Sequence, residues 1–344
     1  MSTDLKGNAD ASHHDGRKID QFADKDGKFR RPASKFRNFV SADPGAEFPA
    51  EKDRYVLYIN PGCPWASRTN LVRSLKGLED IIQLVTMDSG MTEQGWAYTG
   101  LHGTDPKDPL YGFTFHRQLY LKADPSYAGR FTVPVLWDKK QETIVSNESS
   151  EIIRMFYSAF DSLLPPERRE SAHPLGGYYP AQNEALRKEI DDMNEWVYDT
   201  VNNGVYKTGF ATTQAAYEEA CEAVFASLDR LEAILEANEK EGNGKYLVGG
   251  HLTEADIRLY PTIARFDVGY YTLFQCNLKM VRHDYPRLHG WLRRLYWDED
   301  VSVTRGAFRK TTYFEHIKRG YANAQKARVI PKGPLPDILP LDAK

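Results

Sequence analysis

The sequence has few cysteines and no long apolar run. Its 344 residues include only Cys63, Cys221 and Cys276, which are too few and too scattered for a disulfide framework. No cysteine and histidine spacing typical of a metal site is present, so no metal is expected. The first 27 residues are polar and charged and resemble no signal peptide. We therefore expect a reducing, cytoplasmic compartment and no membrane partner.

The sequence also lacks a charge of one sign. Its 45 basic and 48 acidic side chains nearly cancel, which gives no electrostatic case for a nucleic-acid partner. Residues 28–37 (KFRRPASKFR) interleave cations with aromatic rings, a pattern that could suggest contact with RNA or a membrane. Because the segment is short and isolated, we expect an arm that packs on the protein's own surface.

The apolar pattern predicts an α/β half followed by an all-helical half. Strands are expected at residues 55–59 and 81–85, with a helix at 65–75 between them, which is typical of a parallel pair joined by a right-handed crossover. Residues 131–138 and 143–146 read as a hairpin, and a helix follows residues 147–150. Val133-Pro134 is a candidate cis peptide, with an ordinary trans bond at a strand start as the alternative.

The length allows two domains, whose boundaries follow shifts in composition. Cys221 falls on an apolar helical stripe and is expected in the core, while Thr253 and Asp256 form a predicted capping box. The predicted order is an N-terminal arm over 1–50, an α/β domain over 51–160 with an irregular insertion at about 88–125, a linker over 161–180, an all-helical domain over 181–326 and an extended tail over 327–344.

Cys63 stands where a buried strand ends, a Pro-Gly turn follows and a helix begins. The N–H groups and partial positive charge of a helix N-terminus favour a thiolate, and Pro64 suits the first helical turn. A dithiol oxidoreductase would carry a second cysteine at the position of Ala66. A mixed disulfide at Cys63 would therefore need an external small thiol or a distant cysteine. The alternative is a half-buried structural cysteine.

Several segments carry a family resemblance. Residues 60–66 (NPGCPWA), with 36–38 (FRN), 147–149 (NES), 198–206 (YDTVNNGVY) and 252–259 (LTEADIRL), resemble the xi class of glutathione transferases, the glutathionyl-hydroquinone reductases. The match runs from the arm to the last helix. The resemblance implies a thioredoxin-like N-terminal domain, an all-α C-terminal domain, glutathione as co-substrate and a homodimer formed through the helical domains.

The resemblance also implies a reaction. The Cys63 thiolate would attack the sulfur of a glutathionyl-hydroquinone, release the hydroquinone and remain as a mixed disulfide with glutathione. A second glutathione would then free the enzyme as oxidised glutathione, which suits a cysteine without a neighbouring thiol.

The glutathione site is carried over position by position. Val133 would pair with the cysteinyl backbone, Glu148 with the ammonium, and Ser149 with the γ-glutamyl carboxylate. The remaining contacts would come from Trp96, Arg130, Phe131 and Thr132. Taken singly, Ser149 could equally be a helix cap, Arg130 a surface cation and Trp96 a core aromatic.

Three tyrosines complete the implied site. Tyr206 is the candidate proton donor to the aromatic ring, and Tyr270 and Tyr313 are candidate hydrogen-bond donors to the Cys63 sulfur. In a chain with 20 tyrosines, any one of them more often packs than reacts.

Two alternatives to the reductase stay open. An omega-like thiol transferase or dehydroascorbate reductase would use the same Cys63. A non-catalytic transferase-like binding module would have no need of a thiol with a low pKa.

Overall fold

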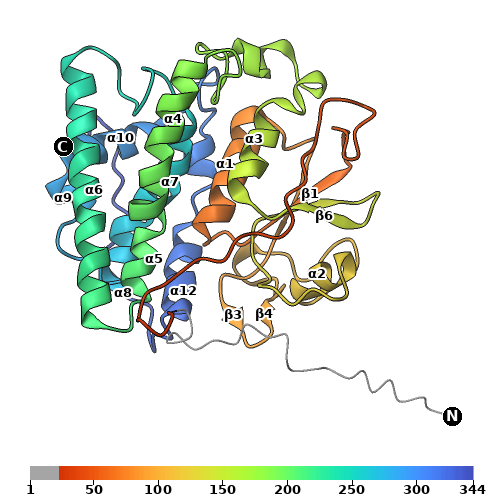
Figure 1. Cartoon of the computed structure of the whole chain (residues 1–344), viewed down its shortest axis with the longest axis horizontal. Helices are drawn as coiled ribbons and strands as arrows, with labels where there is room; N and C mark the ends of the chain where they lie inside the picture. Colours follow the sequence, from red (N-terminus) through yellow and green to blue (C-terminus); the bar gives the residue numbers. More distant parts are fainter. Residues whose placement is uncertain (1–22, 344) are drawn as a thin grey trace.

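The computed structural model describes residues 23–343, and its first half is built on a mixed sheet (Figure 1). The strand order is β2-β1-β5-β6, with β1 parallel to β2 and antiparallel to β5. This arrangement confirms the predicted crossover and hairpin. The four strands are β1 (Tyr55–Ile59), β2 (Gln83–Thr86), β5 (Val135–Asp138) and β6 (Thr143–Ser146).

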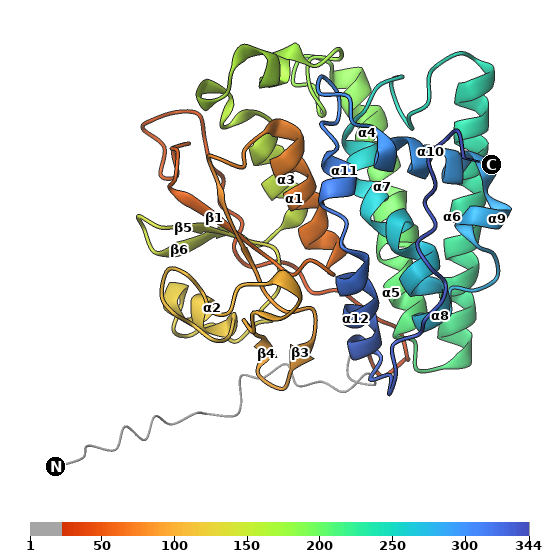
Figure 2. The same cartoon turned by 180° about the vertical axis from the view of Figure 1, so that it is seen from behind.

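Two helices connect the sheet to the helical half. Helices α1 (Pro64–Lys76) and α3 (Ser149–Ser158) pack side by side, and α1 also contacts α7 (Glu254–Arg265) (Figure 2). Every residue of α1 is buried as a result. The start of α1 therefore lies at the junction between the two halves of the molecule.

The second half is helical, as predicted. In α7 the main-chain N–H of Thr253 donates to the Asp256 carboxylate at 3.1 Å, and Cys221 is 3% exposed, which confirms the capping box and the core position. The other elements are α4 (Glu184–Val197), η7 (Tyr198–Asn202), α5 (Gly204–Gly209), α6 (Gln214–Lys240), η8 (Phe266–Tyr270), α8 (Tyr271–Leu273), α9 (Val281–Asp284), α10 (Pro286–Trp297), α11 (Ala307–Lys310) and α12 (Phe314–Ala324).

Residues 88–125 are more regular than expected, since they form a short hairpin and a helix. The elements of this segment are β3 (Met91–Thr92), β4 (Gly95–Trp96), η3 (Leu101–Gly103) and α2 (Arg117–Ala123). The expected linker contains three short turns of helix: η4 (Asp161–Leu163), η5 (Pro166–Arg168) and η6 (Glu170–Ala172).

The strand predicted from residue 131 begins only at Val135. Before it, the Val133-Pro134 bond is cis, as anticipated. The carbonyl of Thr132 accepts a hydrogen bond from the Tyr120 hydroxyl at 2.8 Å. The donor to this carbonyl is therefore a side chain of helix α2 and not the backbone of a neighbouring strand.

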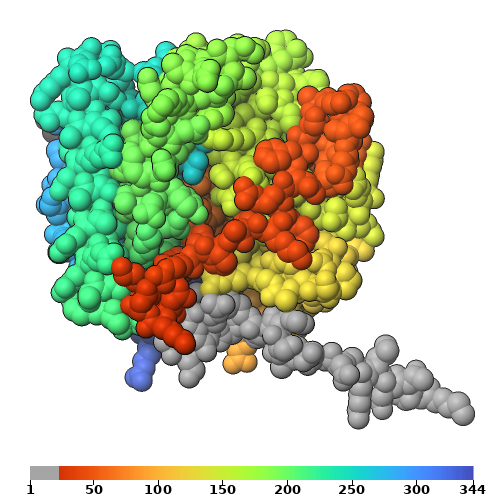
Figure 3. Space-filling model, viewed as in Figure 1, coloured from red at the N-terminus to blue at the C-terminus, as the bar shows by residue number. Residues whose placement is uncertain are grey.

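The arm from residue 23 onwards and the tail up to residue 343 lie along the surface. The described part of the arm runs across the face of the molecule, from the helical half to the sheet (Figure 3). Phe29 is 4% exposed, which confirms that the arm packs on the protein itself. Residues 1–22 of the predicted arm lie outside the described residues. The tail, residues 327–343, forms no helix or strand, and Ile338 accepts a hydrogen bond from Trp297 Nε1 at 2.6 Å. Within residues 23–343, no helix is long and apolar enough to span a membrane.

Candidate active site

Cys63 is the residue that caps the N-terminus of α1, at the end of a tightly held turn. Gly62 N–H donates to Asn60 Oδ1 at 2.7 Å, and Asn60 Nδ2 donates to the carbonyl of Asp88 at 2.7 Å. A Cβ atom at Gly62 would lie 2.7 Å from the carbonyl oxygen of His316. Because this contact leaves no space for a side chain, only glycine fits the turn before Cys63.

The helical half also holds this turn. Arg265, the last residue of α7, is fully buried, and its Nε donates to the carbonyl of Gly62 at 3.1 Å. A second guanidinium nitrogen donates to the carbonyl of Pro261 at 2.8 Å. The α7 helix therefore fixes the turn and places a positive charge near Cys63.

The electrostatics of Cys63 differ from the prediction. Burial raises the pKa of the thiol, and this effect outweighs the N–H groups of Trp65 and Ala66 and the charges of Arg265 and Arg31, which act to lower it. The Cys63 Sγ lies 3.8 Å from the carbonyl oxygen of Val133. The helix start therefore acts to lower the thiol pKa, as expected, but burial outweighs it and the net shift is upwards.

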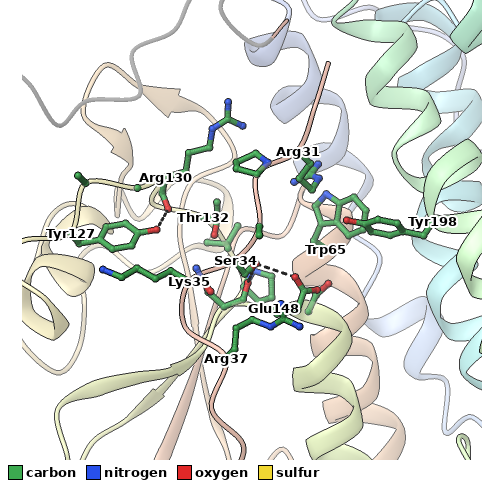
Figure 4. Close-up of a pocket in the computed structure, with 18 residues that line it drawn as sticks. Arg31, Ser34, Lys35, Arg37, Trp65, Tyr127, Arg130, Thr132, Glu148 and Tyr198 are labelled. Atoms are coloured by element: carbon green, nitrogen blue, oxygen red, sulfur yellow. Dashed lines mark hydrogen bonds between the residues drawn. The ribbon is translucent and has the colours of Figure 1, made fainter. Parts of the chain in front are cut away.

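A cavity of about 730 Å³ opens beside this turn (Figure 4). It contains most of the positions predicted for glutathione, but one wall is the N-terminal arm. The lining residues from the α/β half include Trp65, Arg130, Thr132, Val133, Glu148 and Ser149. The arm contributes Arg31, Ser34, Lys35 and Arg37. Sequence reasoning read the arm only as a self-packed segment and missed its place in the cavity.

Glu148, rather than Ser149, caps the N-terminus of α3. Its Oε1 accepts a hydrogen bond from the main-chain N–H of Ser150 at 3.1 Å, and its Oε2 accepts one from Ser34 Oγ at 3.0 Å. Burial acts to raise the pKa of Glu148, but these hydrogen bonds and the charge of Arg68 lower it overall. The cavity therefore holds an ionised carboxylate beside a helix N-terminus.

Two predicted contacts lie outside the lining of the cavity. Trp96 belongs to β4 and packs, partly buried, against the core. The ring of Phe131 packs on those of Tyr120 and Tyr127, with centroids 5.6 and 5.7 Å apart. Both aromatic side chains support the packing around the cavity, which is the alternative weighed for Trp96.

Tyr206 and Tyr270 come together around a tyrosine that sequence reasoning missed. Tyr321 on α12 has its hydroxyl 3.3 Å from that of Tyr206 and 2.6 Å from that of Tyr270. Burial, followed by the neighbouring Cys63 charge, raises the pKa of Tyr206 to about 12. Within the described residues these hydroxyls hydrogen-bond to one another, whereas the Cys63 Sγ lies beside the Val133 carbonyl.

The structure does not bring Tyr313 to the sulfur. Tyr313 immediately precedes α12, and its hydroxyl interacts with the side chain of Asn70. Asn70 lies seven residues along α1 from Cys63, a rise of about 10 Å. Tyr321, two turns further along α12, faces the tyrosine cluster instead. No local motif marks Tyr321, because only the packing of α12 against η8 brings it there.

A thioredoxin-like sheet with a cysteine at its first helix, joined to a helical domain, defines a class of protein. Residues 62–159 match the family model for the glutathione S-transferase N-terminal domain, and residues 214–294 match that for the C-terminal domain. The chain therefore belongs to the glutathione S-transferase family.

Within that family the chain is similar to xi-class proteins. It is 50% identical to the glutathione S-transferase Xi from Phanerochaete chrysosporium, with a TM-score of 0.83 and coverage of 93% of this chain and 97% of that one. It is 48% identical to the glutathionyl-hydroquinone reductase YqjG from Escherichia coli, over 91% of this chain and 90% of the relative. The glutathione S-transferase omega-like 2 from Schizosaccharomyces pombe is 47% identical, with 93% and 97% coverage. These findings confirm the resemblance and the fold class.

Proposed function

We propose that this protein is an enzyme that uses glutathione to reduce glutathionyl-hydroquinones to hydroquinones. The observation that carries the proposal is the position of Cys63 beside the Val133 carbonyl, next to a cavity with an ionised carboxylate. The other two cysteines, Cys221 and Cys276, are buried in the helical half. The name of the Escherichia coli relative supports the choice of substrate.

Glutathione is proposed to lie in the cavity with its thiol at Cys63. Glu148 would bind its ammonium, while Ser149 and the N-terminus of α3 would bind the γ-glutamyl carboxylate. Val133 would pair with the cysteinyl backbone, and Arg130 and Thr132 would line the remainder. Glutathione is bound in a solved structure of the Escherichia coli relative, which is 46% identical with a TM-score of 0.77 and covers 92% of this chain and 96% of that one.

The reaction takes place in two displacements. The Cys63 thiolate attacks the thioether sulfur, a sulfur–sulfur bond forms, and the carbon–sulfur bond breaks with its electron pair going to the ring. Tyr206 is the proposed proton donor, since its raised pKa keeps the phenol protonated. A second glutathione thiolate then attacks the mixed disulfide and releases oxidised glutathione and the Cys63 thiolate. We also propose that the protein acts in the cytoplasm and forms a homodimer through its helical domains.

A mass measurement tests the first displacement. The protein is incubated with a glutathionyl-hydroquinone without free glutathione, and we expect one glutathione on Cys63 and one equivalent of hydroquinone. Cys63→Ser should give neither, while Cys221→Ser, a matched change of a buried cysteine, should behave as the wild type. Hydroquinone release by Cys63→Ser at the wild-type rate would contradict the proposal.

An omega-like thiol transferase or dehydroascorbate reductase is the second candidate, and the name of the Schizosaccharomyces pombe relative, glutathione S-transferase omega-like 2, favours keeping it. Turnover of a glutathionyl-hydroquinone is compared with turnover of a small glutathione mixed disulfide. A higher kcat/KM for the disulfide would favour the thiol transferase. No turnover of either would favour a binding module. The pKa of Cys63 does not separate these cases, because burial raises it in the free protein.

A further inference from the structure

The arm carries five cations between residues 28 and 37, and four of them pair with carboxylates. Within residues 23–343 the exception is Arg31, whose only hydrogen bond joins its Nε to Asn203 Oδ1 at 3.0 Å. The four pairs are Lys28 with Glu219, Arg30 with Asp24 and Asp26, Lys35 with Asp124, and Arg37 with Glu151. Arg31 is thus the one arm cation without a countercharge among the described residues.

Aromatic side chains surround the guanidinium of Arg31. Its central carbon lies 4.5 Å from the ring centroid of Trp65 and 5.3 Å from that of Tyr206. In Figure 4 this guanidinium lies beside the Trp65 ring at the cavity. The neighbouring Trp65 Nε1 is also buried and has no acceptor among the described residues. The terminal nitrogens of Arg31 and the indole N–H of Trp65 therefore meet at one place without an acceptor among the described residues.

This arrangement indicates that the acceptor comes with the substrate. The Arg31 side chain is half-buried among rings, and a cation partly removed from water in this way gains more from a charged acceptor than an exposed cation does. Because Arg31 lies over the rings of Tyr206, the proposed proton donor, and of Trp65, two residues after Cys63, it is positioned beside the reacting groups. It stands on the Tyr206 side of the cavity, where the proposed function places the hydroquinone ring.

We propose that Arg31 is a further catalytic residue, which binds the ring oxygen next to the carbon–sulfur bond and stabilises its negative charge. This inference rests on the proposed function. The substrate reacts as its keto tautomer, in which the sulfur-bearing carbon also holds a hydrogen and the adjacent carbon is a carbonyl. When the Cys63 thiolate takes the sulfur, the carbon–sulfur electron pair forms the ring double bond. The carbonyl pair moves to oxygen, and the product is the hydroquinone monoanion.

The negative charge therefore appears on an oxygen, where a guanidinium is an effective partner. Arg31 provides two terminal nitrogens for this oxygen, because only its Nε is used by Asn203. The monoanion then takes a proton and leaves as neutral hydroquinone. That proton comes from solvent, because Tyr206, whose ring centroid lies 5.3 Å from the guanidinium, supplies the hydrogen on the sulfur-bearing carbon of the keto tautomer, the role that the proposed function gives it.

A leaving-group series tests the role of Arg31. The substrates are the glutathionyl derivatives of hydroquinone, chlorohydroquinone and trichlorohydroquinone, whose phenol pKa falls along the series. In Arg31→Met we expect kcat/KM to fall about 10²-fold for the unsubstituted ring and progressively less as chlorine is added. Arg31→Lys should recover part of the loss. Arg30→Met, a matched change at the adjacent arginine, should leave the whole series near the wild type.

Two further measurements distinguish stabilisation of the ring oxygen by Arg31 from an effect of Arg31 on glutathione binding or on the Cys63 thiol. Calorimetry with glutathione should give the same Kd for Arg31→Met and the wild type, and iodoacetamide alkylation against pH reports any change in the Cys63 pKa. An equal loss for all three substrates, or a loss matched by weaker glutathione binding, would overturn the inference. If instead the wild type reduces none of the substrates, the proposed function itself fails.

Discussion

Replacing Glu148 by glutamine should weaken glutathione binding while leaving the helix start intact. Glu148 Oε1 accepts the Ser150 N–H at 3.1 Å, and a glutamine oxygen can accept the same bond. The substitution removes the negative charge that the proposed function assigns to the γ-glutamyl ammonium. The change therefore separates ligand binding from helix capping.

The size of the effect follows from the environment of the carboxylate. Glu148 is partly buried, so its interaction with an ammonium is screened less than at the surface. A hydrogen bond to a charged group contributes about 1.5–3 kcal/mol, so we expect the Kd for glutathione at pH 7 to rise roughly 10- to 150-fold. Isothermal titration calorimetry measures this change directly.

The pH dependence provides a second measurement of Glu148. Its pKa is lowered from the ordinary value, so the carboxylate stays ionised as the pH falls into the range where an ordinary glutamate takes up a proton. Wild-type affinity should therefore hold as the pH falls towards 5, and it should decline only when the carboxylate takes up a proton at lower pH. In Glu148→Gln this decline should be absent.

A matched control is Glu184→Gln, which removes the same charge at an exposed position in the first turn of α4, outside the cavity. It should bind glutathione like the wild type. The reasoning is refuted if Glu148→Gln keeps its circular dichroism spectrum and binds glutathione within about twofold of the wild type at pH 7.

Two other substitutions test the groups around the sulfur. Arg265→Met removes a buried cation that lowers the pKa of the Cys63 thiol, so this pKa should rise. The pH profile of Cys63 alkylation should therefore shift to higher pH. Superimposable profiles for the variant and the wild type would contradict this. Tyr321→Phe leaves the buried Tyr270 hydroxyl without its 2.6 Å partner and also removes the contact with Tyr206. It should lower the free energy of unfolding by about 1–3 kcal/mol in urea, and a change below about 0.5 kcal/mol would argue against it.

The fold could be predicted from the sequence wherever a short apolar run met a turn signal. The strand at residues 55–59, the hairpin partner at 143–146 and the helix after residue 147 all appear as expected. The prediction failed where distant side chains take the hydrogen bonds of the backbone. Tyr120 binds the carbonyl of Thr132, so the strand begins at Val135 rather than at residue 131.

The candidate site likewise contains residues that the sequence predicts and residues that it does not. Cys63, Val133 and Glu148 lie at strand ends and helix starts, which local sequence signals mark. Val133 and Glu148 line one cavity, and the Cys63 sulfur lies beside Val133. Tyr321 and Arg31 carry no such mark. Tyr321 depends on how α12 packs, and Arg31 depends on where an irregular arm crosses the surface. The family resemblance points to Tyr313, and nothing in the sequence marks Tyr321, because the packing of α12 decides which of its faces turns inwards.

The reactivity of Cys63 is therefore a property of the whole chain. The helix start supplies N–H groups, but burial outweighs them and the thiol pKa is raised. The charges that act against burial come from distant segments: Arg265 at the end of α7, and Arg31 in the arm, on the cavity wall. A substrate whose ring becomes an anion as the sulfur leaves would give Arg31 a negatively charged partner, which it does not have among the described residues. The arm and the helical domain thus act on a reaction that begins at the thioredoxin-like domain.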